Sequence, residues 1–92
     1  MSNLEELKVE LTAIAKAMRS RADLEEDAQF AIELELLATV LEAAVRSDEK
    51  VIMEECKTAV LDRIKTLRKR AAARLATRLA KSLSSDKGKY LN

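Results

Sequence analysis

Residues 23–45, DLEEDAQFAIELELLATVLEAAV, decide the fold. On a helix of about 100° per residue, this stretch has an apolar stripe with spacings of three and four. The stripe consists of Phe30, Leu34, Leu37, Leu41 and Ala44. A second apolar stripe on the opposite side consists of Ile32, Leu36, Val40 and Ala43. A helix that is apolar on two sides needs two neighbours, so we expect a central helix over residues 24–45.

The segment before this stretch predicts a first helix over residues 3–19. One apolar row runs along it at spacings of three and four, formed by Leu4, Leu7, Leu11, Ile14 and Met18. Asn3 is a good N-cap for this helix, and Asp23 with Glu26 forms a candidate capping box for the central helix. The link between the two helices, residues 19–22, is short, which predicts antiparallel packing.

The segment after the central helix predicts a third helix over residues 48–82, with Ser47 as its N-cap. At 1.5 Å per residue it is about 50 Å long, against about 33 Å for the central helix. It must therefore overshoot its neighbour or bend. Residues 84–92 show no periodicity, so we expect a single helical domain over residues 1–83 and a disordered tail.

The composition agrees with an all-α fold. The 92 residues include no proline, one glycine and two aromatic residues, while 48% are hydrophobic and 36% are charged. Aromatic and β-branched residues are too few for a sheet. We therefore expect a three-helix antiparallel bundle or elongated helical hairpin, whose long third helix projects as a basic arm.

The sequence contains few of the residue types and motifs that catalysis uses. The chain has no histidine, and its one glycine, Gly88, lies near the end, so imidazole catalysis and a phosphate-binding loop are both excluded. Glu33 and Glu42 would be ligands of an all-carboxylate metal site, but they fit better as the solvated boundary between the two stripes. Cys56 lies on the apolar side of the third helix and is best interpreted as a small buried residue. We expect a non-enzymatic protein without catalytic residue, cofactor, metal or small-molecule substrate.

The sequence also indicates a compartment. The longest uncharged stretch, residues 36–41, is far shorter than the roughly 18 residues of a spanning helix. The first ten residues are charged from Glu5 onward and contain no apolar signal-peptide core. A single cysteine fits a reducing environment. We therefore expect a cytoplasmic protein.

The net charge of +1 hides a strong asymmetry. Residues 1–62 hold fifteen acids and seven bases, a net charge of −8, whereas residues 63–92 hold ten bases and one acid, a net charge of +9. Such a charge asymmetry gives information about binding partners rather than about the fold.

The predicted arm combines this charge with an apolar row. Its basic stripe consists of Arg70, Arg74, Arg78 and Lys81. Beside the stripe, at four-residue spacing, lie Leu75, Leu79 and Leu83. Such a basic amphipathic helix has four interpretations: a solvated face that completes the core, a protein-docking helix, a nucleic-acid-binding helix and a membrane-surface helix. The absence of Trp and Phe from the arm argues against the membrane.

Nucleic-acid binding would be non-specific, because residues 63–85 contain no Asn, Gln or aromatic residue to contact a base. We favour a protein-interaction module of the accessory, inhibitor or adaptor type. We expect it to act as a homodimer or on another protein through the leucines and basic residues of the arm. The second apolar stripe, with Ile32, Leu36 and Val40, is a possible second interface. Non-specific nucleic-acid binding by the arm is the alternative.

Overall fold

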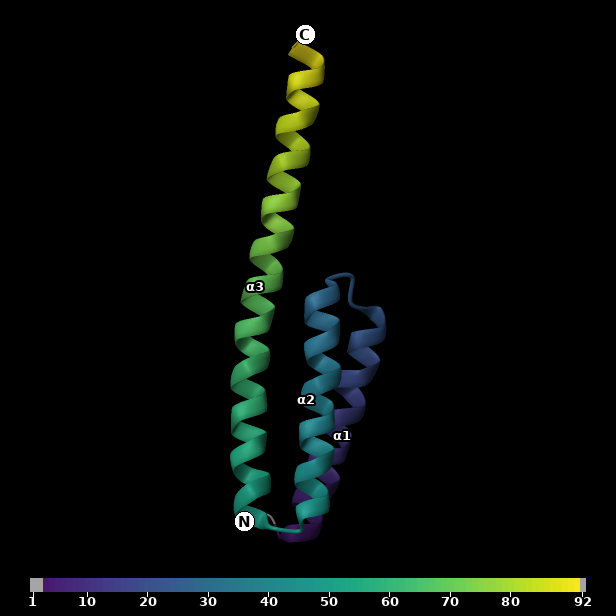
Figure 1. The fold of residues 1–92 in the computed structure, drawn as a ribbon, viewed down its shortest axis with the longest axis vertical. Helices are drawn as coiled ribbons and strands as arrows, with labels where there is room; N and C mark the ends of the chain where they lie inside the picture. Colours follow the sequence, from purple (N-terminus) through teal and green to yellow (C-terminus); the bar gives the residue numbers. More distant parts are fainter. Residues whose placement is uncertain (1–2, 92) are drawn as a thin grey trace.

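The computed structural model describes the backbone of residues 3–91 and the side chains of residues 3–84. Over this range the chain forms three α-helices and no strand: α1 spans Leu4–Leu24, α2 spans Ala28–Ser47 and α3 spans Lys50–Leu91. α1 and α2 form a hairpin, and α3 returns beside α2 and continues far past both (Figure 1). The predicted all-α bundle with a long third helix is confirmed.

α1 begins where the sequence predicts but ends later. The side chain of Asn3 accepts a hydrogen bond from the backbone N–H of Glu6 at 2.8 Å, as expected of an N-cap. The helix then continues to Leu24 rather than stopping near residue 19. The reason is burial: Ala22 follows Met18 at the four-residue spacing of the buried face, and no glycine or proline interrupts this stretch.

The later end of α1 moves the start of α2. The N-cap is Asp27 rather than Asp23, and its carboxylate accepts a hydrogen bond from the backbone N–H of Phe30 at 3.0 Å. Because Asp23 lies inside α1, the predicted capping box with Glu26 is wrong. Only residues 25–27 connect the two helices, and so short a link keeps them antiparallel.

A two-residue turn connects α2 to α3. Asp48 has a left-handed backbone conformation with φ of 59°, which ends α2; aspartate tolerates this region better than most residues. Ser47 is therefore the last residue of α2 and not the predicted N-cap of α3. α3 begins at Lys50 instead of residue 48. The Ser47 hydroxyl still accepts a hydrogen bond from the Glu49 N–H at 3.3 Å.

The core lies on one face of each helix. α2 packs against both neighbours, while α1 and α3 touch each other along a smaller surface. Of the first predicted stripe, Phe30, Leu34, Leu41 and Ala44 are buried and Leu37 is partly buried. The largest fully buried side chains are Leu11, Leu41, Met53 and Val60.

The second stripe of α2 lies in solvent. Ile32 and Leu36 are each 61% exposed and Val40 is 43% exposed, so the expectation that each stripe would face its own helix is wrong. The reason is geometric. In a three-helix bundle the two neighbours of any helix lie at the corners of a triangle, on the same side of that helix. One stripe and its flanks therefore contact both neighbours.

α3 overshoots the bundle. Its 42 residues correspond to about 63 Å, against about 30 Å for the 20 residues of α2. The molecule accordingly measures 66 × 19 × 17 Å. The helix does not end near residue 82 but continues through Leu91, into the stretch predicted to be an irregular tail. This stretch contains no proline, and one glycine costs a helix only about 1 kcal/mol. Residue 92 lies outside the described residues.

No helix among the described residues combines the length and the apolar character needed to cross a membrane.

Candidate interaction surfaces

α3 leaves the bundle at an ion pair that we call the junction, formed by Arg74 and Asp27. The Arg74 guanidinium donates two hydrogen bonds to the Asp27 carboxylate, from Nε to Oδ2 at 2.7 Å and from Nη2 to Oδ1 at 2.8 Å. The same carboxylate caps α2 through Phe30, and its side chain is only 10% exposed. Arg74 and the Phe30 N–H lower the pKa of Asp27 to about 2. The junction therefore ties the arm to the start of α2.

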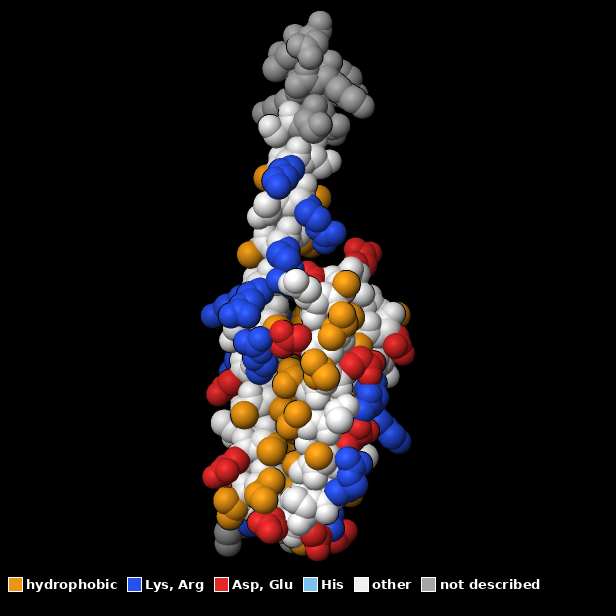
Figure 2. Space-filling model, in the orientation of Figure 1, with side chains coloured by type: hydrophobic (Ala, Val, Ile, Leu, Met, Phe, Trp, Pro, Cys, Tyr) orange, Lys and Arg blue, Asp and Glu red, His pale blue; other side chains and the backbone are white. Residues whose placement is uncertain are grey.

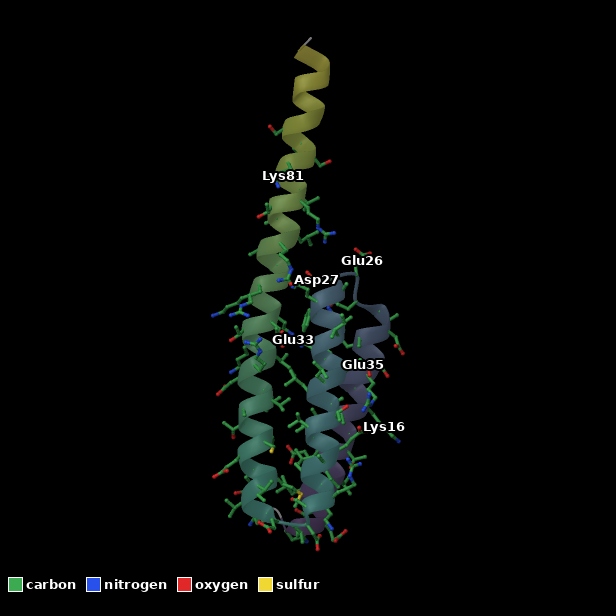
Figure 3. All side chains as sticks on the ribbon, in the orientation of Figure 1. Lys16, Glu26, Asp27, Glu33, Glu35 and Lys81 are labelled. Carbon is green, nitrogen blue, oxygen red and sulfur yellow. The ribbon has the colours of Figure 1, made fainter. Side chains whose placement is uncertain are left out.

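A second arginine of α3 is also used inside the molecule. Arg63 makes a forked contact with the carboxylate of Glu33, with N···O distances of 3.1 and 3.2 Å. Figure 3 shows Glu33 and Asp27 on the side of α2 toward α3, and Glu35 on the other side. Glu33 is thus a partner of α3, and the described residues contain no cluster of three or more potential metal ligands. The two forked arginines fix the register of α3 on α2.

The other side of α2 is held by α1 in a similar way. Arg19 of α1 donates hydrogen bonds to Glu35, at 2.5 Å, and to Glu42. The pKa of Glu42 is lowered by its hydrogen bond with Arg19. Ion pairs between Lys8 and Asp48, and between Lys57 and Glu10, join further parts of the bundle; Lys8 and Glu10 belong to α1. Several acids of the −8 half are therefore already engaged within the bundle.

Beyond the junction α3 rises past the end of the α1–α2 hairpin (Figure 1). We call residues 75–91 the arm. Leu75, Leu79 and Leu83 are 47%, 56% and 66% exposed, so the solvated-face interpretation, in which these leucines complete the core, is wrong. Arg78 and Lys81 are exposed and form no ion pair with any side chain that the structure describes. Lys81 lies well past Glu26 and Asp27, which mark the end of the bundle (Figure 3).

The predicted basic stripe is thus divided. Arg74 belongs to the junction, whereas Arg70, Arg78 and Lys81 remain exposed and without an ion pair among the described side chains. Figure 2 shows Lys and Arg side chains gathered where α3 leaves the bundle and along the projecting helix, while Asp and Glu lie on the bundle. The charge asymmetry of the sequence is therefore also an asymmetry in space.

A second surface follows α2. The outer face of α2, formed by Ile32, Leu36 and Val40, is exposed, and Ile52 of α3 is 37% exposed. Figure 2 shows hydrophobic side chains in a band along the bundle. Next to Ile52, Met53 is fully buried. Cys56 is partly buried and packs against the core.

The structure also contains a groove that sequence reasoning missed. It follows the boundary between α1 and α3 as two connected hollows of about 390 and 330 Å³, which share Arg21, Phe30 and Arg68. The first hollow lies between Ile14 and Leu61, and the second reaches Leu75 at the base of the arm. A signal existed: Leu61, Arg68 and Leu75 recur every seven residues, a second row on α3 beside the buried one.

The chain shows no match to any family model, to any curated protein or to any solved structure in comparisons of each kind.

Proposed function

We propose that this protein is a non-enzymatic, helix-mediated interaction module that docks on a protein partner through the arm. Leu75, Leu79 and Leu83 form the apolar anchor. The exposed cations Arg78 and Lys81 of the arm, with Arg70 just before the junction, raise the association rate. The observation that carries this proposal is the exposure of the three leucines on a helix that has left its bundle.

The magnitudes favour the leucines as the main source of affinity. Full burial of one leucine side chain contributes about 1.5–3 kcal/mol, whereas an exposed ion pair contributes about 0–1 kcal/mol. A helix that exposes three leucines to water at four-residue spacing would therefore gain most of its binding free energy from burying them against a partner. The outer face of α2 offers a second apolar surface for the same or another partner.

Non-specific nucleic-acid binding is the second candidate. It is supported by the exposed cations of α3: Arg78 and Lys81 on the arm, and Arg70 just before the junction. The internal ion pairs of Arg63 and Arg74 weaken it, because they remove two guanidiniums from the row that would follow phosphates. We place docking on protein first for this reason.

A single cysteine agrees with a cytoplasmic location.

Two matched variants test the proposal in affinity capture from cell extract, with and without nuclease. The first is Leu75→Ala with Leu79→Ala, which keeps every charge; the second is Arg78→Gln with Lys81→Gln, which keeps every leucine and almost the full helix propensity. Docking predicts that the leucine variant loses the captured protein, that the charge variant loses less, and that nuclease changes neither. Capture that depends on the cations and disappears with nuclease would instead establish the nucleic-acid function.

A further inference from the structure

The groove between α1 and α3 continues into the leucine face of the arm. One exposed row runs along this face of α3 at spacings of four and three, formed by Leu61, Lys65, Arg68, Ala72, Leu75 and Leu79. Its first part lines the two hollows of the groove, and its last part belongs to the arm, where Leu83 follows four residues on. A row that repeats every seven residues in this way is the pattern that packs against another helix.

The base of the groove is apolar. Ile14, Met18 and Phe30 line it from α1 and α2, and Leu61, which is 39% exposed, lines it from α3. The groove is open because α1 and α3 touch each other along a smaller surface than the other helix pairs. From Leu61 to Leu83 the row extends for about 33 Å along α3, which matches a partner helix of about six turns.

The first hollow adds positive charge to this apolar base. It is lined by Arg21, Lys65 and Arg68 and by no acid. Arg21 pairs with Glu25 at 3.4 Å. Lys65 and Arg68 are exposed and form no ion pair with any side chain that the structure describes. The first hollow therefore leaves two unpaired cations beside an apolar surface.

The second hollow does not offset this charge. Two of its lining acids are already engaged, since Glu25 pairs with Arg21 and Asp27 belongs to the junction. Its other charged lining residues, besides Arg68, are Glu26 and Arg78, which are both exposed and of opposite sign. The unpaired charge of the groove as a whole is therefore positive.

We infer that the occupant of this groove is an acidic amphipathic helix of another protein, which continues from the groove along the arm leucines. This inference rests on the proposed docking function and names the class of its partner. The apolar side chains of such a helix cover the base of the groove and Leu75 and Leu79, and its carboxylates lie beside Lys65 and Arg68. The apolar contacts supply most of the affinity, and the carboxylates select the partner.

The same surface disfavours the other candidate partners. Two copies of this chain can pair their arm leucines, but a second basic arm would bring further cations to Lys65 and Arg68, so this contact is weaker than one with an acidic helix. Nucleic acid would bring phosphates to the two cations but no apolar side chains to cover Ile14 and Leu61. An acidic amphipathic helix matches both the charge and the apolar row.

Two synthetic peptides of three heptads test this inference by fluorescence anisotropy with the full chain. Both carry leucine at heptad positions a and d; the acidic peptide carries glutamate at e and g, and the basic peptide carries lysine there. The like charges at e and g also keep each peptide from pairing with itself. We expect the acidic peptide to bind with a Kd on the order of 10 μM or tighter, and the basic peptide to bind at least about tenfold more weakly. Equal binding of the two peptides, or no binding of the acidic one, would overturn the inference.

A charge-reversal variant locates the contact. Lys65→Glu with Arg68→Glu should weaken binding of the acidic peptide and strengthen binding of the basic one, each by at least about tenfold. The matched control is Lys16→Glu with Lys50→Glu, which changes the net charge equally at exposed residues that line neither hollow. Lys16 lies on the opposite side of the bundle from α3 in Figure 3. We expect the control to bind both peptides as the unmodified chain does; an equal effect of the two variants would overturn the groove as the binding site.

The variant Leu75→Ala with Leu79→Ala separates this inference from the proposed function. Both predict that the variant binds the acidic peptide more weakly than the unmodified chain does. If the unmodified chain does not bind the acidic peptide but still captures a protein from extract through these leucines, the docking function stands and the acidic class is wrong. If the variant binds the acidic peptide as well as the unmodified chain, the arm is not the anchor and both are wrong. A DNA duplex that displaces the peptide through Lys65 and Arg68, regardless of the leucines, would overturn the inference in favour of nucleic acid.

Discussion

The two halves of α3 have the same helical backbone and opposite surroundings. In the bundle half, Val60 and Leu67 are 2% and 3% exposed, and Arg63 is paired with Glu33. In the arm, Leu79 is 56% exposed and Arg78 has no ion pair among the described side chains. Both halves carry leucines and basic residues at helical spacing; what changes is the presence of α1 and α2. An amphipathic pattern therefore shows that a helix face needs a partner, but not whether this partner belongs to the same chain.

Alanine substitutions of two leucines of α3 should differ most in their effect on the free energy of unfolding. Leu67→Ala should lower the free energy of unfolding by about 2–5 kcal/mol, because it leaves a cavity in the core. Leu79→Ala should change it by less than about 0.5 kcal/mol, because its side chain is exposed in the single chain. Urea unfolding at about 1 μM protein measures both. A comparable loss for Leu79→Ala would mean that the arm folds back onto the bundle.

The junction should give a smaller, pH-dependent effect. The Asp27 pKa is about 2 in the folded chain against an ordinary 3.8, so folding favours the ionised carboxylate. Its contribution is present above about pH 4 and is lost as the pH falls toward 2. Asp27→Asn keeps an oxygen that accepts the Phe30 N–H, but loses the charge that Arg74 binds. The stability difference between wild type and Asp27→Asn should therefore shrink between pH 4 and pH 2 in urea titrations. A difference that stays constant over this range would contradict the ion pair.

A matched pair on α2 separates core from candidate interface. Leu34 is 2% exposed and Leu36 is 61% exposed, although both lie on the same helix. Leu34→Ala should destabilise the chain by about 2–5 kcal/mol, and Leu36→Ala by less than about 0.5 kcal/mol. Thermal unfolding of the two variants makes this comparison. A large effect of Leu36→Ala would show that the outer face of α2 is covered in solution.

The smallest expected effect concerns the exposed cations. Replacing Arg70, Arg78 and Lys81 by Gln should leave helix content and stability almost unchanged, because Gln is nearly as good a helix former. Under the docking account, the wild type should not bind a fluorescent DNA duplex at about 50 mM salt and 10 μM protein. Binding that weakens with salt, with a slope that flattens by about 0.9 per cation removed, would move the nucleic-acid function to first place.

Much of this architecture follows from local patterns. The buried stripes of α1 and α2, the Asn3 cap and the long third helix with its exposed leucines all follow from spacing, capping chemistry and length. The helix ends were less predictable. Asp23 and Asp27 are both acceptable N-caps, and the choice between them depends on the burial of Ala22 and on Arg74, which is 47 residues away from Asp27.

Predicting the candidate surfaces from the sequence would require even more long-range geometry than predicting the helix ends. The outer face of α2 could be assigned to solvent only once both neighbours were known to lie on one side of the helix. Likewise, Arg74 and Arg78 are equivalent in the sequence, and only the place where α2 begins makes one a structural residue and leaves the other exposed. The groove between α1 and α3 requires the mutual position of two helices that are not adjacent in the chain.

The central claim is that the arm leucines serve association rather than folding. Urea unfolding tests it most directly. The two proteins compared are the wild type and the variant with Leu75, Leu79 and Leu83 all changed to Ala, each from about 1 to 100 μM protein. Self-association stabilises the folded chain by an amount that grows with the logarithm of the protein concentration. We predict that the two proteins unfold at the same urea concentration at 1 μM, and that only the wild-type midpoint rises with protein concentration. The claim would be contradicted if the variant were less stable than the wild type at every protein concentration and neither urea midpoint changed with concentration.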